Sequence, residues 1–319
     1  MAGNLNLNLT STISQAPGTK PQAFYDKTLL AVLRQTEFGF DRFAQKKAIP
    51  QGNGRTVNFR KLGQLEPALT PLTEGVTPDG ATASKTNITA TVEQYGDYMS
   101  FSDRVNFEEI DPVIKGYTVE QGYQAKETLD IIVREILSAG TNVFYAGGKT
   151  SRAELGAANV FTIRDARKIV RFFKKNHVKP LVGNDYACFI SPDTAFDIMD
   201  DPDFEKAMDY GGNVQPMMSN EIGRIFQVRY YEVTNNKVFS GAGAGGIDVH
   251  AAIFMGRNAY GVTEISGNGN VKNITKSLGS AGTADPLDQR QTIGWKINSF
   301  GAVRLEELAI ARYEHAVTV

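Results

Sequence analysis

The sequence of 319 residues is poor in the side chains that build covalent or metal-stabilised folds. Its one cysteine, Cys188, cannot form a disulfide bond within the chain, and the strand-like run 186–190 around it predicts a core position. The three histidines, His177, His250 and His315, lie far apart in the sequence and lack the spacing of metal ligands. Neither a disulfide framework nor a metal site is therefore expected.

Long hydrophobic runs are also missing. No stretch approaches the roughly 20 apolar residues of a membrane-spanning helix. Residues 1–15 lack the basic and hydrophobic regions of a signal peptide. These absences predict a soluble protein that is made in a cytoplasm and does not bind a membrane.

Recognisable catalytic motifs are absent as well. Gly148-Lys149-Thr150 resembles the end of a phosphate-binding loop, but Val143 stands where that loop requires its first glycine. The glycines of 241–246 precede a strand-like run, whereas a dinucleotide-binding fingerprint precedes a helix. We expect no catalytic, cofactor-binding or metal-binding residues, although missing motifs alone do not exclude an enzyme.

Charge is nearly balanced, with 34 Lys and Arg against 35 Asp and Glu. Residues 1–60 nevertheless hold eight basic and three acidic residues. Such a segment often faces an anion such as DNA, and an ordinary solvated surface explains it at least as well. For a second basic segment, 164–175, we favour a solvated helix face over a phosphate-binding one.

The longest regular pattern predicts a helix at residues 112–139. Asp111 is a good N-cap, Pro112 suits the first helical position, and Gly140 suits the C-terminal end. Apolar residues recur between them at helical spacing. Such a helix spans roughly 40 Å. Because it carries no catalytic constellation, we interpret it as a spine against which the other parts pack.

The segment before the spine predicts a long two-stranded arm at 51–105. Its strands are expected at 56–62 and 85–102, with a polar, proline-rich tip between them. A change of apolar alternation at Gly96 predicts a β-bulge. Because an isolated hairpin is marginally stable in water, something outside its own subunit should hold this arm.

The rest of the chain predicts a polar N-terminal arm, one or two amphipathic helices before residue 50, a compact α/β lobe and closing strands. The further elements that we expect are helices at 162–176 and 192–199 and strands at 223–233, 247–255, 270–277, 292–297 and 303–313.

The order of these parts resembles the major capsid protein of tailed bacteriophages, which has the Hong-Kong-type coat fold. Residues 285–296, with the sequence DPLDQRQTIGWK, resemble the "DPL-Q-R-GWK" stretch of one branch, the coat proteins similar to that of phage N-four. Tyr95-Gly96 and Phe101-Ser102 resemble the return strand of the extended E-loop in that branch.

The resemblance implies an α+β fold with five parts. They are an N-terminal arm at 1–22, an N-terminal helix region at 23–50, an E-loop hairpin at 51–105, a P-domain at 106–155 and 262–319 with the spine helix, and an A-domain at 156–261.

The function that the resemblance implies is structural. Copies would assemble as hexamers and pentamers into an icosahedral head shell that encloses double-stranded phage DNA without reading its sequence. Portal and scaffolding proteins are expected partners, and a decoration protein is a further candidate. The protein would reside in the virion and assemble in the host cytoplasm.

In this fold the E-loop and the N-terminal arm contact neighbouring subunits. The candidate contact residues are Asn4, Leu7, Thr10, Glu66, Pro71, Glu74, Pro78 and Lys85. Weaker candidates for facing DNA are Lys20, Lys27, Arg34, Lys46 and Lys47. Two other interpretations stay open: a nanocompartment shell of the same fold that packages an enzyme, and a soluble nucleic-acid-binding protein that uses 164–175. An enzyme in the 160–260 lobe is less favoured.

Overall fold

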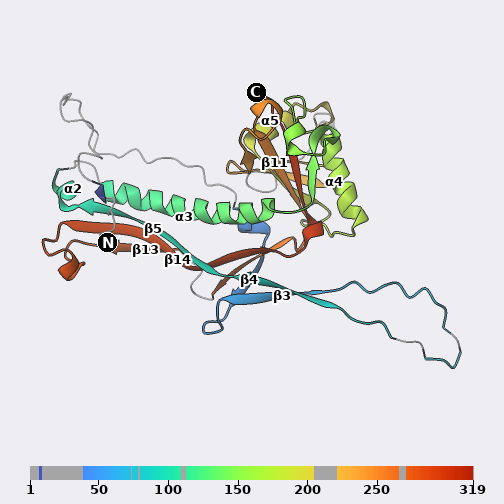
Figure 1. Cartoon of the computed structure of the whole chain (residues 1–319), viewed down its shortest axis with the longest axis horizontal. Helices are drawn as coiled ribbons and strands as arrows, with labels where there is room; N and C mark the ends of the chain where they lie inside the picture. The colour runs from blue at the N-terminus through green and yellow to red at the C-terminus, as the bar shows by residue number, and fades with distance from the viewer. Residues whose placement is uncertain are drawn as a thin grey trace.

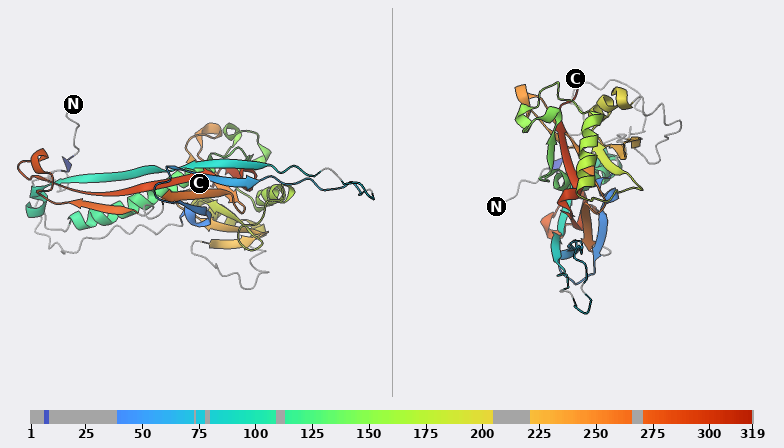
Figure 2. Two further views of the ribbon diagram at one scale, coloured as in Figure 1. Left: turned by 90° about the horizontal axis from the view of Figure 1, so that it is seen from below. Right: turned by 90° about the vertical axis from the view of Figure 1, so that its right-hand side faces the viewer.

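The structure is a computed structural model that describes residues 7–8, 39–72, 74–77, 80–108, 113–204, 221–265 and 271–318. A long helix and long strands lie side by side, a compact lobe lies at one end of them, and a thin hairpin projects past the lobe (Figures 1 and 2). The α-helices are α2 (Asp103–Glu108), α3 (Val113–Ser138), α4 (Ile163–Lys175) and α5 (Pro192–Met199).

Helix α3 confirms the predicted spine, with ends one residue inside the predicted ones. It packs along the long strand β14 (Arg290–Arg304) and is fixed there by two side-chain hydrogen bonds. Gln121 Nε2 donates to the carbonyl of Ile293 at 3.0 Å, and Trp295 Nε1 donates to Gln124 Oε1 at 2.9 Å. Towards the lobe, Leu137 is fully buried, so burial as well as helix propensity stabilises α3.

Among the described residues, the sheet beneath α3 has six strands. Their order is β1 (Leu7–Asn8), β5 (Glu93–Ser102), β14, β12 (Tyr260–Ile265) and β2 (Gln45–Ile49), and β13 (Lys272–Lys276) also pairs with β14. Strand β2 corrects our prediction of a helix across 23–50. Within the described part, a 3₁₀ helix at Phe40–Phe43 leads into β2, because parallel pairing with β12 outweighs local helix preference.

The projecting hairpin consists of β3 (Thr56–Leu62) and β4 (Lys85–Thr91), which form a two-stranded sheet of their own. The predicted strand 85–102 is in fact two strands, because the chain leaves β3 at Val92 and continues as β5 beside β14.

The predicted bulge at Gly96 is wrong. The register shift lies on the opposite strand, between Ile297 and Phe300, and β5 pairs regularly through Gly96. A Cβ atom at Gly96 would lie 2.7 Å from the carbonyl oxygen of Trp295, so this position has no room for a side chain.

In its described part the lobe contains a seven-stranded sheet, which confirms the predicted α/β arrangement. Its order is β6 (Val143–Tyr145), β15 (Ile310–His315), β11 (Val249–Met255), β7 (Tyr186–Ile190), β9 (Val228–Glu232) and β8 (Glu221–Ile225), and β10 (Val238–Phe239) pairs with β11. The predicted strand 303–313 is wrong: β14 ends at Arg304, a 3₁₀ turn follows, and β15 joins this other sheet. The predicted strand 223–233 is a hairpin of two strands, β8 and β9.

Both faces of the lobe sheet are covered. Helices α4 and α5 pack on one face, where Ile169 and Ile198 meet Cys188 in a fully buried cluster. The other face packs against the 3₁₀ helix Phe40–Phe43 and the end of α3, where Phe40 and Phe189 meet edge to face at 5.0 Å. The full burial of Cys188 confirms its predicted core position.

Polar contacts join the C-terminal end of α3 to the lobe. Arg134 Nη1 donates to the carbonyl of Asn235 at 2.9 Å, and Lys237 pairs with Glu135 at 2.7 Å. The guanidinium of Arg312 donates to the carbonyl of Ser138, one of the last carbonyls of the helix. These contacts make the joint between spine and lobe a fixed one.

Candidate assembly surfaces

The loop 63–84, which joins β3 to β4, is the most exposed apolar feature of the described chain. Leu65, Leu69, Leu72 and Val76 are 59%, 86%, 79% and 63% exposed. The loop contains acidic residues and no lysine or arginine. Exposed apolar side chains concentrated in one segment are typical of an interaction site, because each is stabilised when it leaves water.

The predicted contact residues of the loop lie where the sequence suggested. Glu66, Pro71 and Glu74 are exposed on it, and Lys85 begins β4 opposite Leu62. Six of the predicted site residues lie outside the described residues: Asn4, Thr10, Lys20, Lys27, Arg34 and Pro78.

Leu7 has an intrachain contact. In β1 it pairs in parallel register with Ser100 of β5 in the same chain. Its role between subunits therefore stays a prediction.

The two described candidates for facing DNA have intrachain partners. Lys46 pairs with Asp41 at 2.8 Å, and Lys47 donates to the carbonyl of Asn58 at 2.9 Å. Lys47 also lines an open groove of about 1540 Å³ between β3 and the lobe. Exposed pairs contribute little to stability and do not prevent either lysine from meeting an anion.

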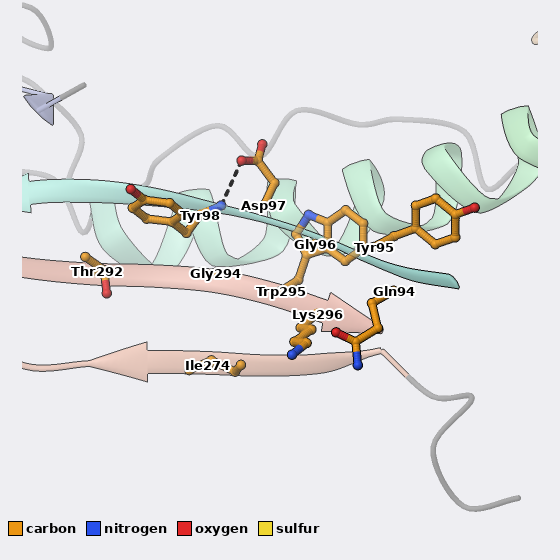
Figure 3. Close-up of a pocket in the computed structure, with 10 residues that line it drawn as sticks. All are labelled: Gln94, Tyr95, Gly96, Asp97, Tyr98, Ile274, Thr292, Gly294, Trp295 and Lys296. Atoms are coloured by element: carbon orange, nitrogen blue, oxygen red, sulfur yellow. Dashed lines mark hydrogen bonds between the residues drawn. The ribbon is translucent and has the colours of Figure 1, made fainter. Parts of the chain in front are cut away.

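A second surface lies on the face of the six-stranded sheet that points away from α3. Because Trp295 faces α3, its neighbours Gly294 and Lys296 face the opposite side. There β5, β14 and β13 enclose a shallow pocket of about 350 Å³ (Figure 3). The missing side chain at Gly294 opens the pocket, and Tyr98 and Ile274, 61% and 42% exposed, form its apolar rim. Sequence reasoning missed this surface because three distant segments build it.

A buried chain of hydrogen bonds joins two histidines in the lobe. His250 and His315 are direct register partners on β11 and β15, with ring centroids 6.3 Å apart. Although far apart in the sequence, they are neighbours in space. Ser191 Oγ lies 2.9 Å from His250 Nδ1, and Thr194 Oγ1 lies 3.4 Å from His315 Nε2. The two hydroxyls are 2.8 Å apart.

The direction in which these hydrogen bonds are donated follows from His315. His315 Nδ1 lies 2.8 Å from the carbonyl of Ala316, which can only accept, so Nδ1 carries the hydrogen. In the neutral ring, Nε2 then accepts from Thr194, Thr194 accepts from Ser191, and His250 Nδ1 donates to Ser191. A second proton on His315 would make Nε2 a donor, and the hydroxyls of Thr194 and Ser191 would then both donate in the opposite direction.

Burial sets the charge of both rings. It lowers the pKa of His315 to about 4, because a fully buried imidazolium loses its hydration. Burial also lowers the pKa of His250, while the nearby Asp193 carboxylate opposes that shift. Both histidines are therefore neutral at pH 7, and their ring nitrogens form hydrogen bonds inside the lobe.

Other candidate chemistry finds no support among the described residues. Burial raises the pKa of the Cys188 thiol well above its usual value, so a reactive thiolate does not form there. The described His, Cys, Asp and Glu side chains form no group able to hold a metal ion. None of the described helices is long and apolar enough to cross a membrane.

A spine helix on a long sheet, a compact lobe and an apolar loop projecting into solvent define a subunit that is built to contact other chains. A family model described as phage capsid protein matches residues 85–313, and the chain belongs to this family. It is therefore a structural protein of the phage head shell.

Solved capsid structures share the fold. The capsid of Ralstonia phage GP4 matches with a TM-score of 0.74 and 15% identity, over 96% of this chain and 99% of that one. The head structure of Helicobacter pylori bacteriophage KHP40 matches with a TM-score of 0.69 and 13% identity, over 96% of this chain and 97% of that one. The Cyanophage Pam1 capsid matches with a TM-score of 0.67 and 14% identity, over 96% of this chain and 98% of that one. No curated protein matches the sequence.

Proposed function

We propose that copies of this chain assemble as hexamers and pentamers into an icosahedral shell that encloses double-stranded phage DNA. The observation that carries the proposal is the loop 63–84. Leu69 and Leu72 are more than three-quarters exposed on a segment that extends away from its own subunit. Within the part of the chain that the structure describes nothing buries them, whereas a neighbouring copy would.

In this proposal the loop lies over a neighbouring subunit. Its acidic side chains, Glu66 and Glu74, and its leucines would meet a surface that is basic and apolar. The sheet face around Tyr98 has this character, because Lys272 and Lys296 accompany its exposed rim. Complementary charge would guide the approach, and burial of leucine side chains would hold the contact.

Further parts of the proposal follow from the resemblance. The chain would belong to the branch similar to the coat protein of phage N-four, on the strength of residues 285–296. Portal and scaffolding proteins would act with it, and a decoration protein would be a further partner. Its location would be the virion, after assembly in the host cytoplasm. The proposed part boundaries are those given in the sequence analysis; strands β6 and β15, which these boundaries assign to the P-domain, pair within the lobe sheet.

The test is deletion of residues 66–83, followed by size-exclusion chromatography and negative-stain electron microscopy. We expect the intact chain, co-expressed with its neighbouring genes, to give capsomer rings or closed shells, and the deletion to give a soluble monomer. A matched variant keeps the loop length and replaces Leu65, Leu69 and Leu72 by serine; it should also fail to close shells. Normal shells from the deletion would refute the proposal. The contents of the purified shells, DNA or an enzyme, separate a virion from a nanocompartment.

A further inference from the structure

The outer face of α4 is strongly basic and poor in acidic partners. Arg164, Arg167, Arg171 and Lys174 are all exposed, and within the described residues none of them pairs with a carboxylate. The helix contains one acid, Asp165, which is buried. This acid accepts from Lys168 at 2.6 Å. The face therefore presents a row of cations to solvent.

An aromatic side chain lies beside this row at a strained turn. Phe226 and Gln227 join β8 to β9, and both have positive φ angles, 47° and 66°, where glycine or asparagine is normally found. Phe226 is 48% exposed, and the guanidinium of Arg167 lies 4.7 Å from its ring centroid. Backbone strain that holds an aromatic ring in solvent is characteristic of functional positions.

The outer face of α5 has the opposite charge. Phe196 and Met199 are 69% and 50% exposed, and the exposed residues Asp193, Asp200 and Asp203 flank them. No basic residue accompanies these carboxylates on the helix.

The placement of these charges is unfavourable within the isolated subunit. Arg164 lies in the first turn of α4, at the positive end of the helix dipole, and Asp200 is the C-cap of α5, at the negative end of its dipole. No ion pair within the described residues neutralises either charge, and at the start of α4 the Asp201 carboxylate accepts from Ile163 N at 3.1 Å.

The two faces also match in spacing. Both helices pack on the same side of the lobe sheet, so both rows point outward from one layer. Arg164 and Arg171 are seven residues apart, as are Asp193 and Asp200, which corresponds to about 10 Å along each helix. Two helices laid side by side would bring both pairs together, with Phe196 between them.

We propose that the outer face of α4, with Phe226, docks on the outer face of α5 of a second copy of this chain. This inference rests on the proposed function and names the contact that would build the capsomer rings. In this proposal the contact is heterologous: the α4 face of each copy meets the α5 face of the next, and repetition of such a contact closes a ring when the rotation allows. The opposite charges select the correct face and orient it.

The test uses charge reversal at exposed positions. An acidic variant carries Arg164→Glu, Arg167→Glu and Arg171→Glu, which leaves Lys174 as the one cation of that row. A basic variant carries Asp200→Lys and Asp203→Lys, which leaves Asp193 as the one acid. Each variant has two faces of like charge, so we expect ring formation to weaken on the order of a hundredfold, as seen by sedimentation velocity. Circular dichroism and thermal melting should show wild-type folding, because the substituted side chains are exposed.

Mixing makes the test specific. In a mixture of the acidic and basic variants, every contact must join unlike variants, so only rings with an even number of subunits can form. Hexamers should return while pentamers stay absent, giving flat sheets or tubes instead of closed shells. A single chain with all five substitutions has two complementary faces again and should form both ring sizes and closed shells.

The outcomes separate the two proposals. Wild-type rings from either variant alone, or a mixture that forms pentamers, would overturn the docking of α4 on α5 and leave the shell function standing. If the mixture and the five-substitution chain both stay monomeric while wild type assembles, the contact is also wrong. A wild-type chain that forms neither rings nor shells with its neighbouring genes present refutes the shell function itself.

Discussion

The buried histidine His315 should make the stability of the lobe depend on pH in a defined window. Its pKa is about 4 in the folded chain and 6.5 when exposed. Between these values the unfolded chain binds a proton that the folded chain does not. The free energy of unfolding therefore falls as the pH falls from 6.5 towards 4, and is insensitive to this residue above about pH 7.

The magnitude follows from the size of the shift. One pKa unit corresponds to about 1.4 kcal/mol, so the full shift amounts to about 3 kcal/mol, of which about 2 kcal/mol is lost between pH 8 and pH 5. This range avoids most of the titration of ordinary carboxylates, which lies lower. For a protein of marginal stability, a change of this size is easily measured.

The assay is urea denaturation of the soluble subunit at intervals from pH 8 to pH 5, with wild type compared to His315→Gln. The variant cannot titrate in this range, so the pH dependence of its unfolding free energy should be smaller by about 2 kcal/mol across the range. His177→Gln is the matched control, because His177 is exposed, and it should keep the wild-type slope. An unchanged slope in His315→Gln would refute the reasoning.

Three further predictions concern packing and buried charge, each measured as the change in free energy of unfolding. Leu137→Ala should cost about 2–5 kcal/mol because it opens a cavity where α3 meets the lobe, whereas Val119→Ala, at a position 54% exposed, should change stability by less than about 0.5 kcal/mol. Gly96→Ala should cost about 1–3 kcal/mol, since its methyl group would press on the carbonyl of Trp295; no measurable change would contradict the close strand contact. Glu314→Gln should cost about 3–5 kcal/mol, because it removes the buried carboxylate that two arginines share; wild-type stability would show that those arginines find other partners.

Local sequence patterns predicted those elements that are defined by residues close together in the sequence. The spine α3 has a long helical period, β3 alternates, and β7 is a short apolar run around Cys188, so nearby residues are enough to define each. The position of the loop 63–84 could likewise be predicted from its prolines, but we predicted a polar tip, and its exposed leucines were not expected.

Features that depend on distant partners escaped prediction. Val92 gives no local sign that the chain changes from one sheet to another there, since β14 is some two hundred residues away in sequence. The pairing of His250 with His315 depends on the register between β11 and β15. The pocket over Gly294 needs three strands at once. Such contacts are set by tertiary structure, which composition and periodicity do not encode.

Because the end of α3 is fixed to the lobe, a rotation of the lobe moves the whole helix. The contacts from Arg134, Lys237 and Arg312 fix the helix end to the lobe, and from Arg134 the helix extends about 32 Å to its other end. A lobe that turns by about 5° would carry the far end of the helix through about 3 Å, with the sheet attached to it. A rotation of the lobe against a neighbouring subunit therefore becomes a larger displacement at the opposite end of this subunit.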